Sequence, residues 1–226
     1  MDRSIIDYYD ALAPTYDVDR FGNSYGRFLD AQERALLEKY LPRDGARVLD
    51  LGCGAGRLSD RADEGCDASL RSLEVARAKH PLKRFIQADI ADLPYPDASF
   101  EAAFCFHVFM HCQMRQIEAA MREAARVLRP GGVFIADVAS AWRRRLRPSP
   151  TSGWHGGTAL DSRDFQALAL GAGLQRRAME GVMLLPVHRL PASWRGPLRS
   201  VDHTFAGVFP DAASYLVGVF AKEAAV

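Results

Sequence analysis

The chain has 226 residues, of which 48% are hydrophobic, and its formal net charge at pH 7 is +1. This length and apolar content can form one complete hydrophobic core, so we expect a single domain over residues 1–226. A net charge near zero excludes a global field that attracts polyanions, and we predict no nucleic-acid partner. No apolar run approaches the roughly 18 residues of a membrane span, and the N-terminus lacks a signal-peptide core.

The cysteines carry no metal-binding or disulfide pattern. None of the four belongs to a Cys-x-x-Cys pair, and all lie in apolar or motif segments: Cys53, Cys66, Cys105 and Cys112. Such cysteines are typical of reduced thiols in a cytoplasmic protein. We therefore predict a cytoplasmic protein with no membrane contact and no metal site.

Segments with helical and strand periodicity alternate along the chain, which is typical of a layered α/β domain. The expected helices cover residues 25–40, 70–79, 114–128 and 161–170. The expected strands cover residues 47–51, 85–86, 100–106, 133–138, 174–185 and 214–220. A polar connection rich in proline and glycine fills residues 139–158. The apolar run 182–194 is interpreted either as a lining for a hydrophobic ligand or as the end of a strand entering a loop.

The run from Val48 to Arg57 is the most informative feature of the chain. A short apolar strand containing Asp50 ends in three alternating glycines, Gly52, Gly54 and Gly56. Glycines at these positions allow a sharp turn and let the backbone approach a ligand that a Cβ would block. A carboxylate beside the turn disfavours a phosphate ligand and favours a ligand that carries a cation or an amine.

This run resembles the first motif of the class I S-adenosylmethionine-dependent methyltransferases. Three further segments resemble later motifs of that family in the same order: residues 87–94, 100–107 and 127–132. Residues 8–17 resemble the tyrosine-bearing N-terminal cap of its small-molecule members. The resemblance covers about residues 5 to 140 and is to the small-molecule, type 11-like branch. It implies an α/β fold, Rossmann-like and doubly wound, with a mostly parallel sheet and helices on both faces. It also implies a helical cap over residues 1–42, a cofactor-binding core over 43–140 and a variable substrate-side region over 141–226.

The chain departs from the family between Gly56 and Asp67. Only ten residues separate these two positions, whereas a helix-plus-strand crossover needs at least about 10–12 residues for the connection alone. Residues 59–64 are also polar and lack the β-branched run of a buried strand. We therefore predict that the second strand is short or missing, which would weaken the ribose side of a cofactor pocket.

Ligands of open α/β sheets lie at the carboxyl ends of the strands, and the resemblance assigns S-adenosylmethionine to that crevice. It implies that Asp50 and the glycines hold the methionine part, Asp67 the ribose, and Asp89 with Ile90 the adenine. Tyr16 resembles a cap tyrosine that closes over the cofactor. The complete set of predicted cofactor residues is Tyr16, Asp50, Gly52, Cys53, Gly54, Gly56, Asp67, Ala68, Asp89, Ile90 and Phe106.

Two histidines near the end of the fourth expected strand are the candidate catalytic residues. His107 and His111 lie one helical turn apart, and either side chain can accept a proton from a hydroxyl or a phenol. The alternative is a pair of structural histidines at the sheet edge. No nearby carboxylate or cysteine completes an evident metal site.

The leading hypothesis is methyl transfer from S-adenosylmethionine to a small, hydrophobic or natural-product-like acceptor by in-line displacement, in a monomer or a homodimer. Nucleic-acid bases are disfavoured as acceptors because Phe106–Phe109 replaces the Asn/Asp-Pro-Pro-aromatic run of enzymes that methylate them. A nicotinamide-dependent dehydrogenase is a weaker alternative, since its fingerprint also has alternating glycines. The other alternative is a degenerate methyltransferase-fold protein that binds cofactor weakly or not at all and acts as a partner subunit.

Overall fold

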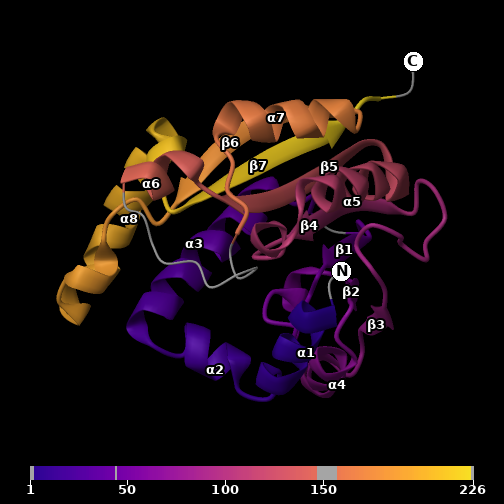
Figure 1. The fold of residues 1–226 in the computed structure, drawn as a ribbon, viewed down its shortest axis with the longest axis horizontal. Helices are drawn as coiled ribbons and strands as arrows, with labels where there is room; N and C mark the ends of the chain where they lie inside the picture. The colour runs from indigo at the N-terminus through magenta and orange to yellow at the C-terminus, as the bar shows by residue number, and fades with distance from the viewer. Residues whose placement is uncertain (1–2, 44, 147–156, 225–226) are drawn as a thin grey trace.

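The computed structural model describes residues 3–43, 45–146 and 157–224. In these ranges three helices precede the sheet, and the later helices lie in the connections between strands (Figure 1). The helices are α1 (Arg3–Leu12), α2 (Tyr16–Phe21), α3 (Ser24–Tyr40), α4 (Leu70–Lys79), α5 (Met114–Val127), α6 (Ala141–Leu146), α7 (Ser162–Gly171) and α8 (Ala192–Val208). The strands are β1 (Val48–Leu51), β2 (Glu64–Asp67), β3 (Arg84–Gln87), β4 (Phe100–Cys105), β5 (Leu128–Ala139), β6 (Leu174–Val182) and β7 (Tyr215–Lys222). Short 3-10 turns are η1 (Ser59–Arg61), η2 (Phe109–His111), η3 (Val187–Arg189) and η4 (Pro210–Ala212).

The seven strands form one sheet in the order β3-β2-β1-β4-β5-β7-β6. β1 to β5 pair in parallel, and β7 runs antiparallel to both of its neighbours, β5 and β6. The mostly parallel, doubly wound α/β sheet predicted from the sequence is therefore confirmed. The strand order reverses between β1 and β4, and such a switch point is where ligands bind in open α/β sheets.

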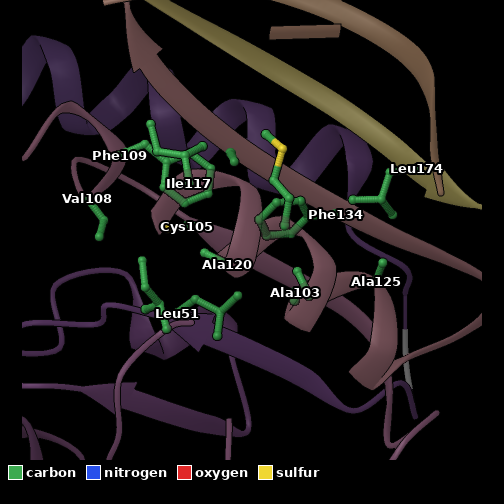
Figure 2. Packing of buried hydrophobic residues seen from close by; sticks show 14 of the residues in the cluster. Leu51, Ala103, Cys105, Val108, Phe109, Ile117, Ala120, Ala125, Phe134 and Leu174 are labelled. Atoms are coloured by element: carbon green, nitrogen blue, oxygen red, sulfur yellow. The ribbon is translucent and has the colours of Figure 1, made fainter. Parts of the chain in front are cut away.

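Successive residues of the central strands pack into different layers. Ala102 and Phe104 of β4 belong to the hydrophobic cluster that contains Leu36 of α3. Ala103 of the same strand belongs instead to the cluster that contains Ile117 of α5. Figure 2 shows part of this second cluster, which also contains Ala120 and Phe134. The alternation follows from the period of two in a strand and leaves both faces of the sheet covered.

The second strand is not missing, and it is as long as its neighbours β1 and β3. β2 has four residues and pairs with both β1 and β3. The helix is what the short connection omits, because only the 3-10 turn η1 lies between β1 and β2. Glu64, which the sequence placed in the polar connection, is the first residue of the strand and is buried. Its Oε1 lies 2.5 Å from Nη2 of Arg47. This ion pair allows a charged residue to occupy a buried strand position.

Two helices were not expected from the sequence. α6 lies within the connection over residues 139–158, and α8 begins at the end of the apolar run 182–194. α8 contains two glycines, Gly196 and Gly207, and a proline, Pro197. Glycine and proline are typical of turns, so the sequence of this segment did not predict a helix. α8 is attached by the buried Asp202, which accepts hydrogen bonds from Gln32 of α3 at 2.6 Å and from the backbone N–H of Leu185. A tertiary contact therefore stabilises a helix of poor intrinsic propensity.

Within the three described ranges, no helix is both long enough and apolar enough to span a bilayer.

Candidate functional site

A pocket lies where β1, β2 and β4 end, and residues of α1 and α2 form part of its wall. Most of the predicted cofactor residues line this pocket, and both candidate catalytic histidines do. The lining members of the predicted set are Tyr16, Asp50, Gly52, Cys53, Gly54, Asp67, Ala68, Ile90, Phe106, His107 and His111. Gly56 and Asp89 are not among the lining residues. Asp89 instead accepts a hydrogen bond from the backbone N–H of Ala91 at 3.0 Å in the adjacent turn.

The glycine turn after β1 is held in a conformation that disfavours side chains. Gly52 has a φ of +69°, and a Cβ there would lie 2.4 Å from Cγ2 of Val108. Gly54 has a φ of +52°, and a Cβ there would meet no protein atom within 4 Å. The left-handed backbone explains glycine at both positions. The open space at Gly54, which lines the pocket, leaves room for a ligand against the backbone.

Two carboxylates line the pocket beside this turn, of which Asp50 is buried and Asp67 is half-buried. Asp50 accepts a hydrogen bond from Ser59 at 2.7 Å, and Asp67 accepts one from the backbone N–H of Gly54 at 2.9 Å. Burial raises the pKa of Asp50 to about 7, although Ser59 and Arg57 oppose the shift. Burial also raises the pKa of Asp67. These two carboxylates fit S-adenosylmethionine. The amino group and the sulfonium of that cofactor favour ionised carboxylates, and its ribose hydroxyls can donate hydrogen bonds to Asp67.

The N-terminal helix closes the pocket through one aromatic contact with η2. The hydroxyl of Tyr9 lies 2.8 Å from Nε2 of His111, and the two rings meet edge to face at 5.6 Å. Tyr16 lies beside Tyr9, with ring centroids 5.6 Å apart. Asp10 also accepts a hydrogen bond from Ser69 after β2. These contacts join α1 to both sides of the switch point.

His107 lies in a buried ionic network below the pocket. Its Nε2 is 2.6 Å from Oε1 of Glu33, and its Nδ1 is 3.4 Å from Oδ2 of Asp137. Arg57 completes the network, with a guanidinium nitrogen 2.6 Å from Oε2 of Glu33 and the guanidinium carbon 3.8 Å from the centroid of the Phe21 ring. His107 has a φ of +61°, an uncommon conformation for a residue other than glycine. Its backbone N–H donates to Asp137 at 2.6 Å, which holds this conformation.

The network sets the charge of each member. Burial alone lowers the pKa of His107, but Glu33 and Asp137 outweigh burial and raise that pKa above its ordinary value. Burial alone raises the pKa of Glu33, but Arg57 and His107 hold it at about 2. Burial raises the pKa of Asp137 to about 6 against the opposing effect of His107. The two carboxylates therefore favour the protonated form of His107, which makes it a poorer proton acceptor.

Sequence reasoning missed Glu33, Arg57 and Asp137. Arg57 follows the third glycine of the motif directly, and Asp137 lies near the end of a strong apolar strand. A buried carboxylate in an apolar strand is a signal for a paired charge, so Asp137 could have been found. Glu33 lies in a helix that is rich in charged residues, and nothing in its position distinguishes it. Among the described residues, no group of three His, Cys, Asp or Glu side chains has the geometry to hold a metal ion.

Comparisons with known proteins agree with this geometry. Residues 49–136 match the family described as "Methyltransferase domain". The uncharacterized protein MJ1252 of Methanocaldococcus jannaschii is 36% identical over 141 residues, covering 61% of this chain and 53% of that protein. Malonyl-[acyl-carrier protein] O-methyltransferase of Erwinia pyrifoliae is 31% identical over 149 residues, covering 58% and 56% respectively. The CcbJ methyltransferase of Streptomyces caelestis has the same fold, with a TM-score of 0.67 at 19% identity over 96% of this chain and 98% of that chain.

The sheet order, the glycine turn and the carboxylates at the switch point define the class I S-adenosylmethionine-dependent methyltransferase fold. Residues 49–136 match the Methyltransferase domain family, so this part of the chain carries a methyltransferase domain of that fold. The chain spans about half the length of the relatives that it matches in sequence.

Proposed function

We propose that the protein transfers a methyl group from S-adenosylmethionine to a small, hydrophobic or natural-product-like acceptor by in-line displacement. One observation carries this proposal: a single pocket is lined by the open backbone of Gly54, the carboxylates of Asp50 and Asp67, and the paired Tyr9 and His111. The first three residues suit the cofactor. The aromatic pair faces the same space and suits an acceptor that must lose a proton.

When bound, the cofactor supplies an electrophilic methyl group on a sulfonium. The protein then has to hold the acceptor in line with that methyl group, and alignment of this kind can supply about 7–11 kcal/mol of the barrier reduction. Asp50 and the glycine turn would hold the methionine part, Asp67 the ribose, and Ile90 the adenine. Tyr16 of α2 would close over the cofactor.

The two histidines have different roles in this proposal. His111 would accept the acceptor's proton, directly or through the hydroxyl of Tyr9, because Nε2 and that hydroxyl already lie 2.8 Å apart. His107 would position the floor of the pocket, because Glu33 and Asp137 already occupy both of its ring nitrogens. The protonated imidazole that these carboxylates favour has no lone pair with which to act as a base.

Binding of S-adenosylhomocysteine, measured by calorimetric titration, tests the cofactor half of the proposal. We expect micromolar binding that Gly54→Val abolishes, because the new side chain enters the ligand space. Gly131→Val is the matched control: Gly131 has a similar φ of +78°, and a Cβ there also meets no protein atom within 4 Å, but it lies outside the pocket. No binding by the wild-type protein at millimolar ligand would favour the alternative, a cofactor-free partner subunit.

The acceptor half requires a separate screen. Formation of S-adenosylhomocysteine would be followed by mass spectrometry with phenols, amines and carboxylic acids as acceptors. The set includes malonyl thioesters, because one relative is named a malonyl-[acyl-carrier protein] O-methyltransferase. A nicotinamide cofactor serves as the negative control. If it raised the melting temperature of the protein and S-adenosylhomocysteine did not, the dehydrogenase alternative would be favoured.

A further inference from the structure

α8 carries an apolar stripe that the rest of the described chain does not cover. Trp194, Val201, Phe205 and Val208 are between 44% and 64% exposed, whereas Asp202 on the same helix is fully buried. At 100° per residue, these four side chains lie within about 60° of one another around the helix axis and roughly a quarter turn from Asp202. The stripe is therefore a coherent flank of the helix and not scattered exposure.

The spacing of the stripe indicates another helix as its partner. Together with the half-buried Leu198, the apolar positions are 194, 198, 201, 205 and 208, so the intervals are four, three, four and three. Side chains at these intervals pack into the spaces of a facing helix. A narrow seam of this kind suits a helix better than a membrane surface, which requires a wide apolar face with basic flanks.

We propose that α8 pairs with α8 of a second copy of this chain, antiparallel across a two-fold axis. The stripe is symmetric about Val201, so an antiparallel partner sets Trp194 against Val208 of the second copy, Leu198 against Phe205, and Val201 against itself. A two-fold interface uses the same patch twice and needs this self-complementarity. The proposal does not depend on the proposed function.

The exposed area is sufficient for a specific contact. A fully covered aromatic side chain buries about 150–250 Å², so Trp194 and Phe205, each more than half exposed, contribute on the order of 100 Å² apiece. With the three aliphatic members of the stripe, two copies supply on the order of 1,000 Å², which is about the lower limit for a specific interface.

α8 is attached firmly enough to serve as an interface. Asp202 accepts hydrogen bonds from Nε2 of Gln32 at 2.6 Å and from the backbone N–H groups of Leu184 and Leu185. Gln32 in turn accepts a hydrogen bond from the backbone N–H of Met183 at 3.1 Å. The flank with the stripe is therefore presented by a helix that is fixed to α3 and to the chain after β6.

Cysteine cross-linking of the full chain tests the pairing. Because Val201 meets itself at the two-fold axis, Val201→Cys should form an intermolecular disulfide under mild oxidation, within the distance limits of such a bond. The native cysteines are all buried, so they interfere little. Thr204→Cys is the matched control, since Thr204 is exposed on α8 but lies outside the stripe.

Sedimentation velocity supplies the independent measurement. We expect a wild-type dimer in the micromolar range that Phe205→Arg converts to a monomer, with at least about a tenfold loss of dimer affinity. Thr204→Arg should leave the dimer unchanged. A wild-type monomer at near-millimolar concentration, equal cross-linking at positions 201 and 204, or a monomer that binds vesicles of anionic phospholipid through the stripe would overturn the proposal.

Discussion

Nε2 of His107 and Oε1 of Glu33 lie 2.6 Å apart, and this contact joins the end of β4 to the middle of α3. Glu33 is buried and also pairs with Arg57, which follows the glycine turn. A single carboxylate on α3 therefore connects the loop that would hold the cofactor to the strand end that would face the acceptor. The connection is ionic and buried, so it is costly to break at any one member.

Loss of one member of the His107–Glu33 pair should destabilise the protein strongly. We expect His107→Asn and Glu33→Gln each to lower the free energy of unfolding by up to about 3–5 kcal/mol, because each removes one of the two ionic partners of a buried charge. The double variant should lose less than the sum of the two, with a coupling of about 1–3 kcal/mol. Urea denaturation of the four proteins measures this cycle, and additive losses would mean that the two side chains do not stabilise each other.

The protonation of His107 should also make stability depend on pH. Its pKa is raised in the folded protein, so its contribution is fully present below the unfolded value of about 6.5. The contribution is lost as pH rises through the higher folded value. NMR titration of the imidazole protons should give a pKa for His107 above that of the unfolded chain. A measured value below the ordinary one would show that burial outweighs the two carboxylates and that His107 is neutral.

The sequence predicted the parts of the fold that depend on local pattern. The glycine turn, the helix at 70–79 and the buried strand near 100–105 each follow from spacing alone, and the structure has them. β2 was predicted less well because its burial depends on the ion pair between Glu64 and Arg47, which periodicity does not reveal. α8 was missed because its stability comes from Asp202 and its contacts with Gln32, on a helix 170 residues away in the chain.

The candidate site divides in the same way. Asp50 and Gly54 are adjacent to the motif and were found by it, and both line the pocket. Glu33 and Asp137 reach His107 only after folding, from positions that are 74 and 30 residues away. One sequence contains many carboxylates, and only the tertiary structure shows which two of them meet one histidine.

Cofactor affinity should increase with pH around neutrality. Burial raises the pKa of Asp50 to about 7, and a ligand that carries an amine or a sulfonium favours the ionised carboxylate. Binding should therefore release a proton, and it should be tighter at about pH 8 than at about pH 6. Titration of S-adenosylhomocysteine in two buffers of different ionisation enthalpy measures the proton release. Asp50→Asn should bind more weakly and lose the pH dependence; an unchanged profile in this variant would assign the titration to another group.

The contact between Tyr9 and His111 should matter for turnover more than for cofactor binding. We expect His111→Gln to lower kcat by about 100-fold or more, since a positioned general base typically contributes 10²–10⁴-fold. Tyr9→Phe should lower kcat less, because it removes only the hydroxyl that lies 2.8 Å from Nε2. Tyr8→Phe is the control, since Tyr8 is adjacent in sequence and is not among the residues that line the pocket.

With an acceptor from the screen, the rate of S-adenosylhomocysteine formation would be measured across pH for all four proteins. The variants should keep the wild-type affinity for S-adenosylhomocysteine. Full turnover by His111→Gln would contradict a role of His111 as the base. The pocket would then contribute only by aligning acceptor and cofactor, and solvent would accept the proton.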